Sequence, residues 1–181
     1  MPYNKNVKKY RIPSNRMQGF DYHANGCYFV TICTKNRVHY FGDIVDGKMH
    51  LSEIGKIAQL EWMKSIELRP DMNLLLDEFV VMPNHVHCIV IIGDNEFNST
   101  ESSKYKNKFG PQSKNLSSII RGFKIAVTTY ARKHNIDFKW QERFHDSIID
   151  DNEGLNRVRA YIINNPQKWK NDEFNVNNIK K

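Results

Sequence analysis

Two apolar runs separated by a two-residue break constrain the fold more than any other part of the sequence. Residues 74–82 read LLLDEFVVM, residues 85–92 read HVHCIVII, and Pro83 and Asn84 lie between them. Branched and aromatic side chains favour strands, whereas proline interrupts a strand ladder. The sequence therefore predicts two consecutive strands here, the second of which carries His85 and His87.

The remaining elements alternate between strand and helix patterns. Strands are expected over residues 28–34 and 144–149, and a hairpin within residues 41–51, where Asp46-Gly47 is a strong turn signal. Apolar residues recur at helical spacing from Ser52 to Arg69, from Leu116 to Lys133, and from the capping residues 150–152 to near Pro166. This order predicts an α+β fold in which helices cover a mainly antiparallel sheet.

The chain of 181 residues, 40% of them hydrophobic, favours one domain with a substantial core. We expect a basic arm over residues 1–20 and a single catalytic domain over residues 21–170. Within it, residues 93–115 are rich in Ser, Asn, Lys and Gly and predict a loop or flexible insertion. The polar tail over residues 171–181 is expected to be frayed, beginning just after Trp169.

Positive charge is concentrated in one part of the chain. The net charge is +7, yet residues 102–136 contain eight Lys and Arg residues and no Asp or Glu. Such clustering is typical of proteins that bind a polyanion, although a solvated helix face with a flexible loop gives the same pattern.

The expected compartment is the cytoplasm. No segment approaches the ~20 consecutive apolar residues of a membrane span, and the basic N-terminus lacks the apolar core of a secretion signal. Cys27, Cys33 and Cys88 are odd in number and contain no Cys-x-x-Cys pair, which favours reduced, buried thiols.

The pair His85 and His87 is the first candidate site. Side chains two residues apart on a strand lie on one face, so both imidazoles can reach one metal ion. A half-buried, hydrogen-bonded histidine pair without a ligand fits the same spacing.

Tyr161 and Asn165 form the second candidate. They lie four residues apart on the last predicted helix and therefore share a face. A phenol is a possible nucleophile for a phosphodiester, and an amide oxygen is a possible ligand for a divalent cation. The ordinary alternatives are a packing tyrosine and an Asn-Pro pair that ends a helix.

Three segments together resemble a known family. Residues 80–87 (VVMPNHVH), 140–146 (WQERFHD) and 161–166 (YIINNP) are similar to the motifs of HUH-superfamily single-tyrosine transposases, specifically the REP-associated tyrosine transposases (RAYT). The residues Tyr28-Phe29-Val30-Thr31, before Asn36-Arg37, also fit. The resemblance extends from Tyr22 to Trp169, and only residues 93–115 resist alignment.

The resemblance implies a ferredoxin-like antiparallel sheet with the His-x-His motif on a central strand. It also implies that His85, His87 and Asn165 hold Mg2+ or Mn2+, and that Tyr161 cuts and rejoins single-stranded or hairpin DNA through a 5′-phosphotyrosine. We further expect the protein to be cytoplasmic and nucleoid-associated, and to act as a monomer or a homodimer. The expected DNA-binding residues are the cations of the basic stretch and one beyond it: Lys104, Lys106, Lys108, Lys114, Arg121, Lys124, Arg132, Lys133 and Arg143.

Two other functions and one other nucleophile stay open at this point. A nucleic-acid-binding protein without catalysis would keep the basic surface, and a zinc hydrolase would use the two histidines with a third ligand and an activated water. Tyr130, on the predicted basic helix, is the competing tyrosine.

Overall fold

A four-stranded antiparallel sheet lies at the centre of the chain, in a computed structural model that describes residues 25–96, 98 and 113–175. Its order is β4 (Leu74–Met82), β5 (His85–Ile92), β1 (Gly26–Cys33) and β6 (His145–Ile149). The chain passes through β1, α1, β4, β5, α2 and β6, which is the ferredoxin-like sequence of elements. The predicted fold class is confirmed, with the two histidines on an interior strand.

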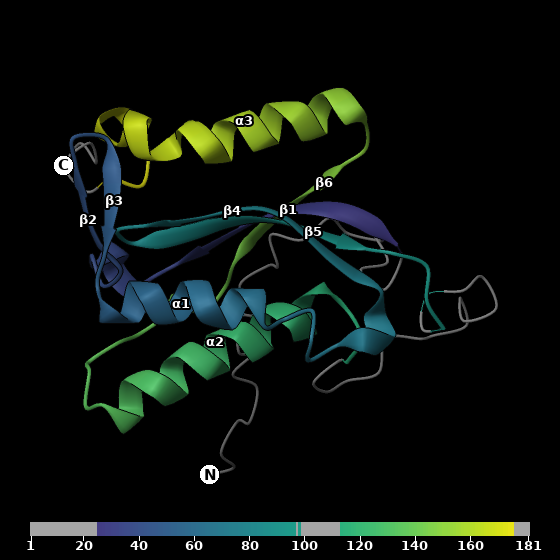
Figure 1. The fold of residues 1–181 in the computed structure, drawn as a ribbon, viewed down its shortest axis with the longest axis horizontal. Coiled ribbons are helices and arrows are strands. Elements are labelled where there is room, and N and C mark those ends of the chain that lie inside the picture. The colour runs from purple at the N-terminus through teal and green to yellow at the C-terminus, as the bar shows by residue number, and fades with distance from the viewer. Residues whose placement is uncertain (1–24, 97, 99–112, 176–181) are drawn as a thin grey trace, which may run out of the picture.

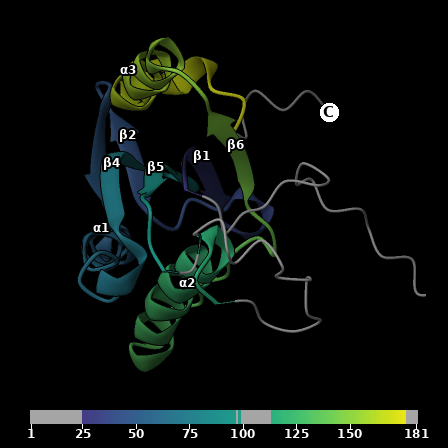
Figure 2. The same ribbon diagram turned by 90° about the vertical axis from the view of Figure 1, so that its right-hand side faces the viewer.

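The helices cover both faces of the sheet. Helices α1 (Glu53–Met63) and α2 (Leu116–Lys133) pack below it in Figure 1, and α3 (Asn152–Lys168) lies above it. Figure 2 shows α3 and α2 at opposite ends of the sandwich. Among the described residues, no helix combines the length and apolarity needed to cross a membrane.

The main core fills the space between the sheet and the pair α1 and α2. Tyr28, Val30 and Ile32 point from β1 into this core, where Trp62 stacks on Phe79. Alternation along the strand places Phe29 and Thr31 on the other face, beneath α3. The sheet therefore has a packed face and a face that is free to build a site.

Side-chain caps start the helices where the sequence predicts. Asn115 and Ser118 form a capping box at α2, and Asp151 Oδ1 accepts a 2.5 Å hydrogen bond from the Gly154 amide at α3. Helix α1 is shorter than expected, since it ends at Met63 rather than near Arg69. There Ser65 turns the chain, because its hydroxyl and its amide bond the carbonyls of Glu61 and Trp62.

Two local irregularities fix the strand geometry. Asp46 and Gly47 both have positive φ in the turn between β2 (Gly42–Val45) and β3 (Lys48–Leu51), which confirms the predicted hairpin. In β4 the register shifts between Leu76 and Phe79. This bulge keeps Leu74, Leu76, Phe79 and Val81 in the core while Asp77 points towards α3.

Helix α3 is held to the sheet by an ion pair and a few apolar contacts. Arg159 donates from Nε to Asp77 Oδ1 at 2.8 Å and from Nη2 to Oδ2 at 2.5 Å. Ile162 is buried beneath the helix, and Pro166 lies in the last turn without ending it before Lys168. These contacts fix which face of α3 meets the sheet.

Candidate functional site

The two histidines lie side by side on the α3 face of β5. His85 is fully buried and His87 is 1% exposed, and their ring centroids are 4.4 Å apart. The residues that alternate with them, Val86 and Cys88, belong to the core on the opposite face. The alternation expected from the sequence thus brings both imidazoles to one point.

Each imidazole is oriented by a hydrogen bond at Nδ1. His85 Nδ1 lies 2.8 Å from Asn84 Oδ1, and His87 Nδ1 lies 2.8 Å from Thr31 Oγ1. A protonated Nδ1 in each ring leaves the Nε2 lone pair available, as in metal sites with oriented histidines.

Burial keeps both rings neutral. It holds the pKa of His85 well below its usual value, with smaller contributions from His87, Arg37 and His39. For His87, burial and then Arg37 lower the pKa to about 3. Neutral imidazoles are the form that binds a metal ion.

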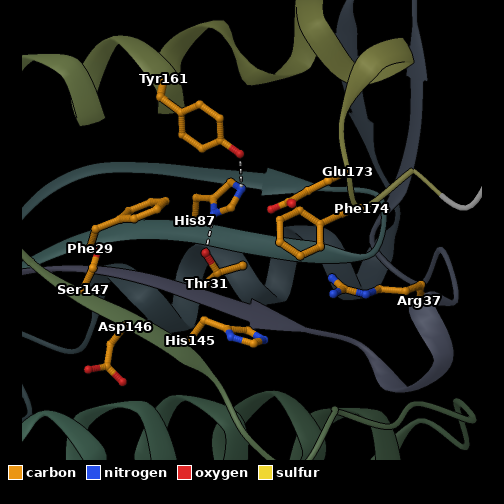
Figure 3. Close-up of a pocket in the computed structure, with 10 residues that line it drawn as sticks. All are labelled: Phe29, Thr31, Arg37, His87, His145, Asp146, Ser147, Tyr161, Glu173 and Phe174. Carbon is orange, nitrogen blue, oxygen red and sulfur yellow. Dashed lines mark hydrogen bonds between the residues drawn. The ribbon is translucent and has the colours of Figure 1, made fainter. Parts of the chain in front are cut away.

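Helix α3 brings Tyr161 and Asn165 to the same histidines. The Tyr161 hydroxyl lies 3.3 Å from His87 Nε2 (Figure 3), and Asn165, one turn later, is 1% exposed. Burial is the main reason that the pKa of Tyr161 rises to about 12, and the carboxylate of Asp172 adds to it. The structure thus brings together all four residues of the two candidate sites.

A carboxylate that the sequence reasoning missed completes the cluster. Asp172 follows α3, and ligand atoms of His85, His87 and Asp172 all lie within 4.8 Å of one another. Burial raises the pKa of this carboxyl group, while the Phe174 amide and the Asn165 side chain hydrogen-bond to it and lower the pKa. No local pattern distinguishes Asp172 from the exposed Glu173 beside it, so only the path of the chain identifies it.

Residues 172–175 pack on the site, whereas the sequence predicts a frayed tail after Trp169. Asn84 Nδ2 donates to the Phe174 carbonyl at 2.8 Å, and the Phe174 ring lies 4.6 Å from the His85 ring. The Arg37 guanidinium carbon lies over the Phe174 ring, 4.1 Å from its centroid. Residues 172–175 therefore form one wall of the site.

The donor set fits a divalent metal ion. Among the described residues, His85 Nε2 and Asn165 Oδ1 are buried without any hydrogen-bond partner. Burying such atoms unpaired is unfavourable by about 1–3 kcal/mol each, which metal coordination would relieve. With His87 and Asp172 they offer two nitrogen and two oxygen donors, a set that suits Mn2+, Mg2+ or Zn2+.

A cavity of about 480 Å3 opens beside these groups. Figure 3 shows Tyr161 above it, His87 and Thr31 at its back, and Phe174 and Arg37 at one end. The site is thus accessible to a ligand larger than water, and its nucleophile candidate, Tyr161, is 38% exposed.

Three of the predicted DNA-binding cations lie on α2, apart from this cavity. Arg121, Lys124 and Arg132 line a second cavity of about 490 Å3 along α2, on the other face of the sheet. Lys124 is partly engaged there, because its ammonium donates to the carbonyls of Gln141 and Glu142. Lys114 pairs with Asp71.

The other predicted cations lie at the end of α2, before β6 or outside the described residues, and the competing tyrosine lies on α2. Lys133 ends α2 and Arg143 precedes β6, whereas Lys104, Lys106 and Lys108 lie outside the described residues. Tyr130 donates to Glu53 at 2.8 Å on the α1 and α2 side of the sheet. It therefore does not share the histidine site.

Comparison with known proteins gives one close relative. An uncharacterized protein of Haemophilus influenzae is 34% identical over 179 residues, covering 96% of this chain and 97% of that protein. The chain belongs to the same family as this protein. No family model matches it.

Solved structures show the same fold. A REP-associated tyrosine transposase bound to a REP hairpin superposes with a TM-score of 0.58 at 20% identity, over 87% of this chain and 74% of that one. A candidate transposase from Deinococcus radiodurans gives a TM-score of 0.39 at 16% identity, over 83% and 97% of the two chains. The first comparison establishes a transposase-like fold, and the second is too distant to add to it.

Proposed function

We propose that this protein is a metal-dependent endonuclease and strand transferase for single-stranded DNA. The observation that carries the proposal is the convergence of the Tyr161 hydroxyl, two neutral imidazoles and the unpaired Asn165 oxygen beside one cavity. The transposase-like fold and the REP hairpin in the related structure support a DNA substrate that contains a hairpin.

Four side chains would hold the metal: His85 and His87 through Nε2, Asn165 through Oδ1, and Asp172 through its carboxylate. A divalent cation bound there would supply polarisation of a phosphoryl oxygen and would offset the Asp172 charge beside the phenol. Mg2+ and Mn2+ are the proposed ions. All four donors and Tyr161 come from one chain, so a monomer can form the site.

Tyr161 would attack the scissile phosphorus. The phenol oxygen forms a bond to the 5′-phosphate, the bond to the neighbouring 3′-oxygen breaks, and that oxygen leaves as a hydroxyl. Since the pKa of Tyr161 is about 12, its proton must pass to a solvent base as the new bond forms, and the leaving 3′-oxygen takes up a proton from solvent. In the free protein His87 Nε2 is positioned to accept a hydrogen bond from this hydroxyl.

The covalent intermediate makes strand joining possible. The phosphotyrosine keeps the energy of the cleaved phosphodiester, so a second 3′-hydroxyl can attack it, release Tyr161 and restore a DNA bond without ATP. Side chains that keep bulk water from the linkage would favour joining over hydrolysis, and Phe29 and Phe174 line the cavity on either side of Tyr161.

The basic surface on α2 would hold the DNA backbone. Arg121 and Arg132 are proposed to contact phosphates, together with the cations of residues 104–108 and with Lys114, Lys124, Lys133 and Arg143. Because this surface lies across the sheet from Tyr161, the substrate would have to span both faces, as a hairpin with a single-stranded extension can.

A covalent-adduct assay tests the function. A labelled single-stranded oligonucleotide containing a hairpin, incubated with Mn2+ or Mg2+, should yield a protein–DNA adduct that survives denaturing electrophoresis and that EDTA prevents. Tyr161→Phe should form none, whereas the matched variant Tyr130→Phe should form as much as the unaltered protein. An adduct with Tyr161→Phe would refute the assigned nucleophile.

The same assay separates the other two functions. DNA binding without metal-dependent cleavage would identify a nucleic-acid-binding protein. Metal-dependent product without an adduct would identify a hydrolase.

A further inference from the structure

The cavity beside Tyr161 continues into another cavity along the edge of the sheet. This edge cavity, of about 640 Å3, lies between β6 and the first half of α3. Four residues line both cavities: Phe29, Ser147, Tyr161 and Glu173. The two spaces therefore form one trough, and Tyr161 lies over its middle.

Phe29 forms the floor where the two cavities join. On β1 it pairs with Ile89 of β5 and Ser147 of β6, and its side chain lies on the face beneath α3. Its ring centroid lies 5.2 Å from that of His87 and 5.9 Å from that of Tyr161, which it meets edge-on. Phe29 is not part of the main core, so its partly exposed ring is available to a ligand (Figure 3).

The charges of the edge cavity disfavour a phosphate. Its lining includes the carboxylates of Asp150, Asp151 and Glu173 and one cation, Arg157, which itself pairs with Glu153 at 3.2 Å. A DNA backbone would be repelled there.

The remaining lining suits a flat, neutral group. Ile149 and Val158 add apolar surface beside Phe29, and Ser147 offers a hydroxyl. An unpaired nucleobase has these properties, and aromatic side chains bind bases by stacking.

From these features we infer that Phe29 stacks on the unpaired base of one nucleotide flanking the scissile phosphate, and that this base occupies the trough beyond Tyr161. The inference rests on the proposed function, because a phosphate at the two histidines positions its neighbouring bases. Phe29 then acts as a substrate-binding residue, which holds the single strand in register with Tyr161.

Binding to abasic DNA tests the inference. The probe is the hairpin oligonucleotide cleaved in the adduct assay, whose cut position defines the two flanking nucleotides. Fluorescence anisotropy with Tyr161→Phe, which cannot cleave, gives the Kd of the intact oligonucleotide and of versions lacking one flanking base. One of the two abasic versions should bind about 5- to 150-fold more weakly, the range for losing one stacked base.

Variants of Phe29 in the same Tyr161→Phe background show whether that loss arises from the ring. With Phe29→Leu, the intact and abasic oligonucleotides should bind almost equally, whereas Phe29→Tyr should restore the difference. The matched control is Phe79→Leu, the same substitution at a ring that packs on Trp62 in the core on the opposite face of the sheet; it should leave the difference unchanged. Thermal melting establishes that each variant is folded.

The outcomes separate this inference from the proposed function. The stacking role is wrong, and the proposed function stands, if the unaltered protein forms the adduct but removing either base raises the Kd by the same factor in Tyr161→Phe with and without Phe29→Leu. If the unaltered protein neither binds nor cleaves hairpin DNA, the proposed function is wrong and the inference falls with it.

Discussion

Asp172→Asn should weaken metal binding strongly while hardly changing the shape of the site. The carboxylate of Asp172 lies with the ligand atoms of His85 and His87 inside a 4.8 Å cluster. The other donors, two neutral imidazoles and an amide, carry no charge. Asp172 is therefore the one charged ligand that a cation would meet in this cluster of described residues.

The magnitude follows from Coulomb's law and desolvation. Two unit charges ~4 Å apart attract by about 4 kcal/mol at an effective dielectric constant of ~20, and a divalent ion doubles this gross value. Removing water from the ion and the carboxylate offsets much of it. We expect a net loss of at least about 2.7 kcal/mol, which corresponds to a Kd for Mn2+ about 100-fold higher.

Calorimetric titration of Mn2+ into metal-free protein measures this loss. Glu173→Gln is the matched control, because it removes the same charge from the next residue, which lines the cavity but does not belong to the ligand cluster. Its Kd should change less than about threefold, since solvent screens exposed charges. Equal Kd values for Asp172→Asn and Glu173→Gln would refute the assignment of Asp172 as a ligand.

Four further predictions concern the support of the site, the DNA surface and the core. Asp77→Arg and Arg159→Asp should each reduce adduct formation, and the charge-reversed double variant should recover part of it; full activity of both single variants would exclude a role for this pair. Hydrogen bonding to Arg159 holds the pKa of Asp77 below its ordinary 3.8, so the pair stabilises the fold above that pH and loses its contribution as acidification protonates Asp77. Acid unfolding monitored by circular dichroism should therefore be shallower in Asp77→Asn. Arg121→Gln and Arg132→Gln should each reduce the slope of log K against log salt by about 0.7–0.9 in DNA-binding titrations, and an unchanged slope would remove that residue from the interface. Trp62→Ala should lower the free energy of unfolding by about 3–5 kcal/mol in denaturant titrations, because the side chain is fully buried against Phe79 and Phe123; a loss below 1 kcal/mol would contradict this account of the core.

The local elements of the fold follow from the sequence because their causes are local. The Asp46-Gly47 turn needs residues that tolerate positive φ, and the observed angles of 51° and 72° satisfy that need. Helix α2 extends from Leu116 to Lys133, as its apolar spacing predicts. Helix α1 shows the limit of such reasoning, because the spacing continues past Met63 although side-chain and turn hydrogen bonds at Ser65 end the helix.

The bulge in β4 is a second feature that depends on tertiary packing. A regular strand would move the side chains after residue 77 to the wrong face, and the extra residue restores Phe79 and Val81 to the core. Asp77 keeps the orientation towards Arg159 that alternation from Leu76 gives it, so the shift changes only the residues that follow. The sequence LLLDEFVVM predicts a strand but not this shift.

The sequence by itself determined the pairs that make up the site. A period of two places His85 beside His87, and a period of 3.6 places Tyr161 above Asn165, because strand and helix geometry is fixed by the backbone. The family resemblance implies that these pairs meet, but only the tertiary structure shows the contacts between them, returns Asp172 to join them and places Phe29 beneath Tyr161. Those contacts depend on how α3 and residues 172–175 pack on the sheet. They join segments more than 70 residues apart, and contacts over such a separation produce no periodic pattern in the sequence.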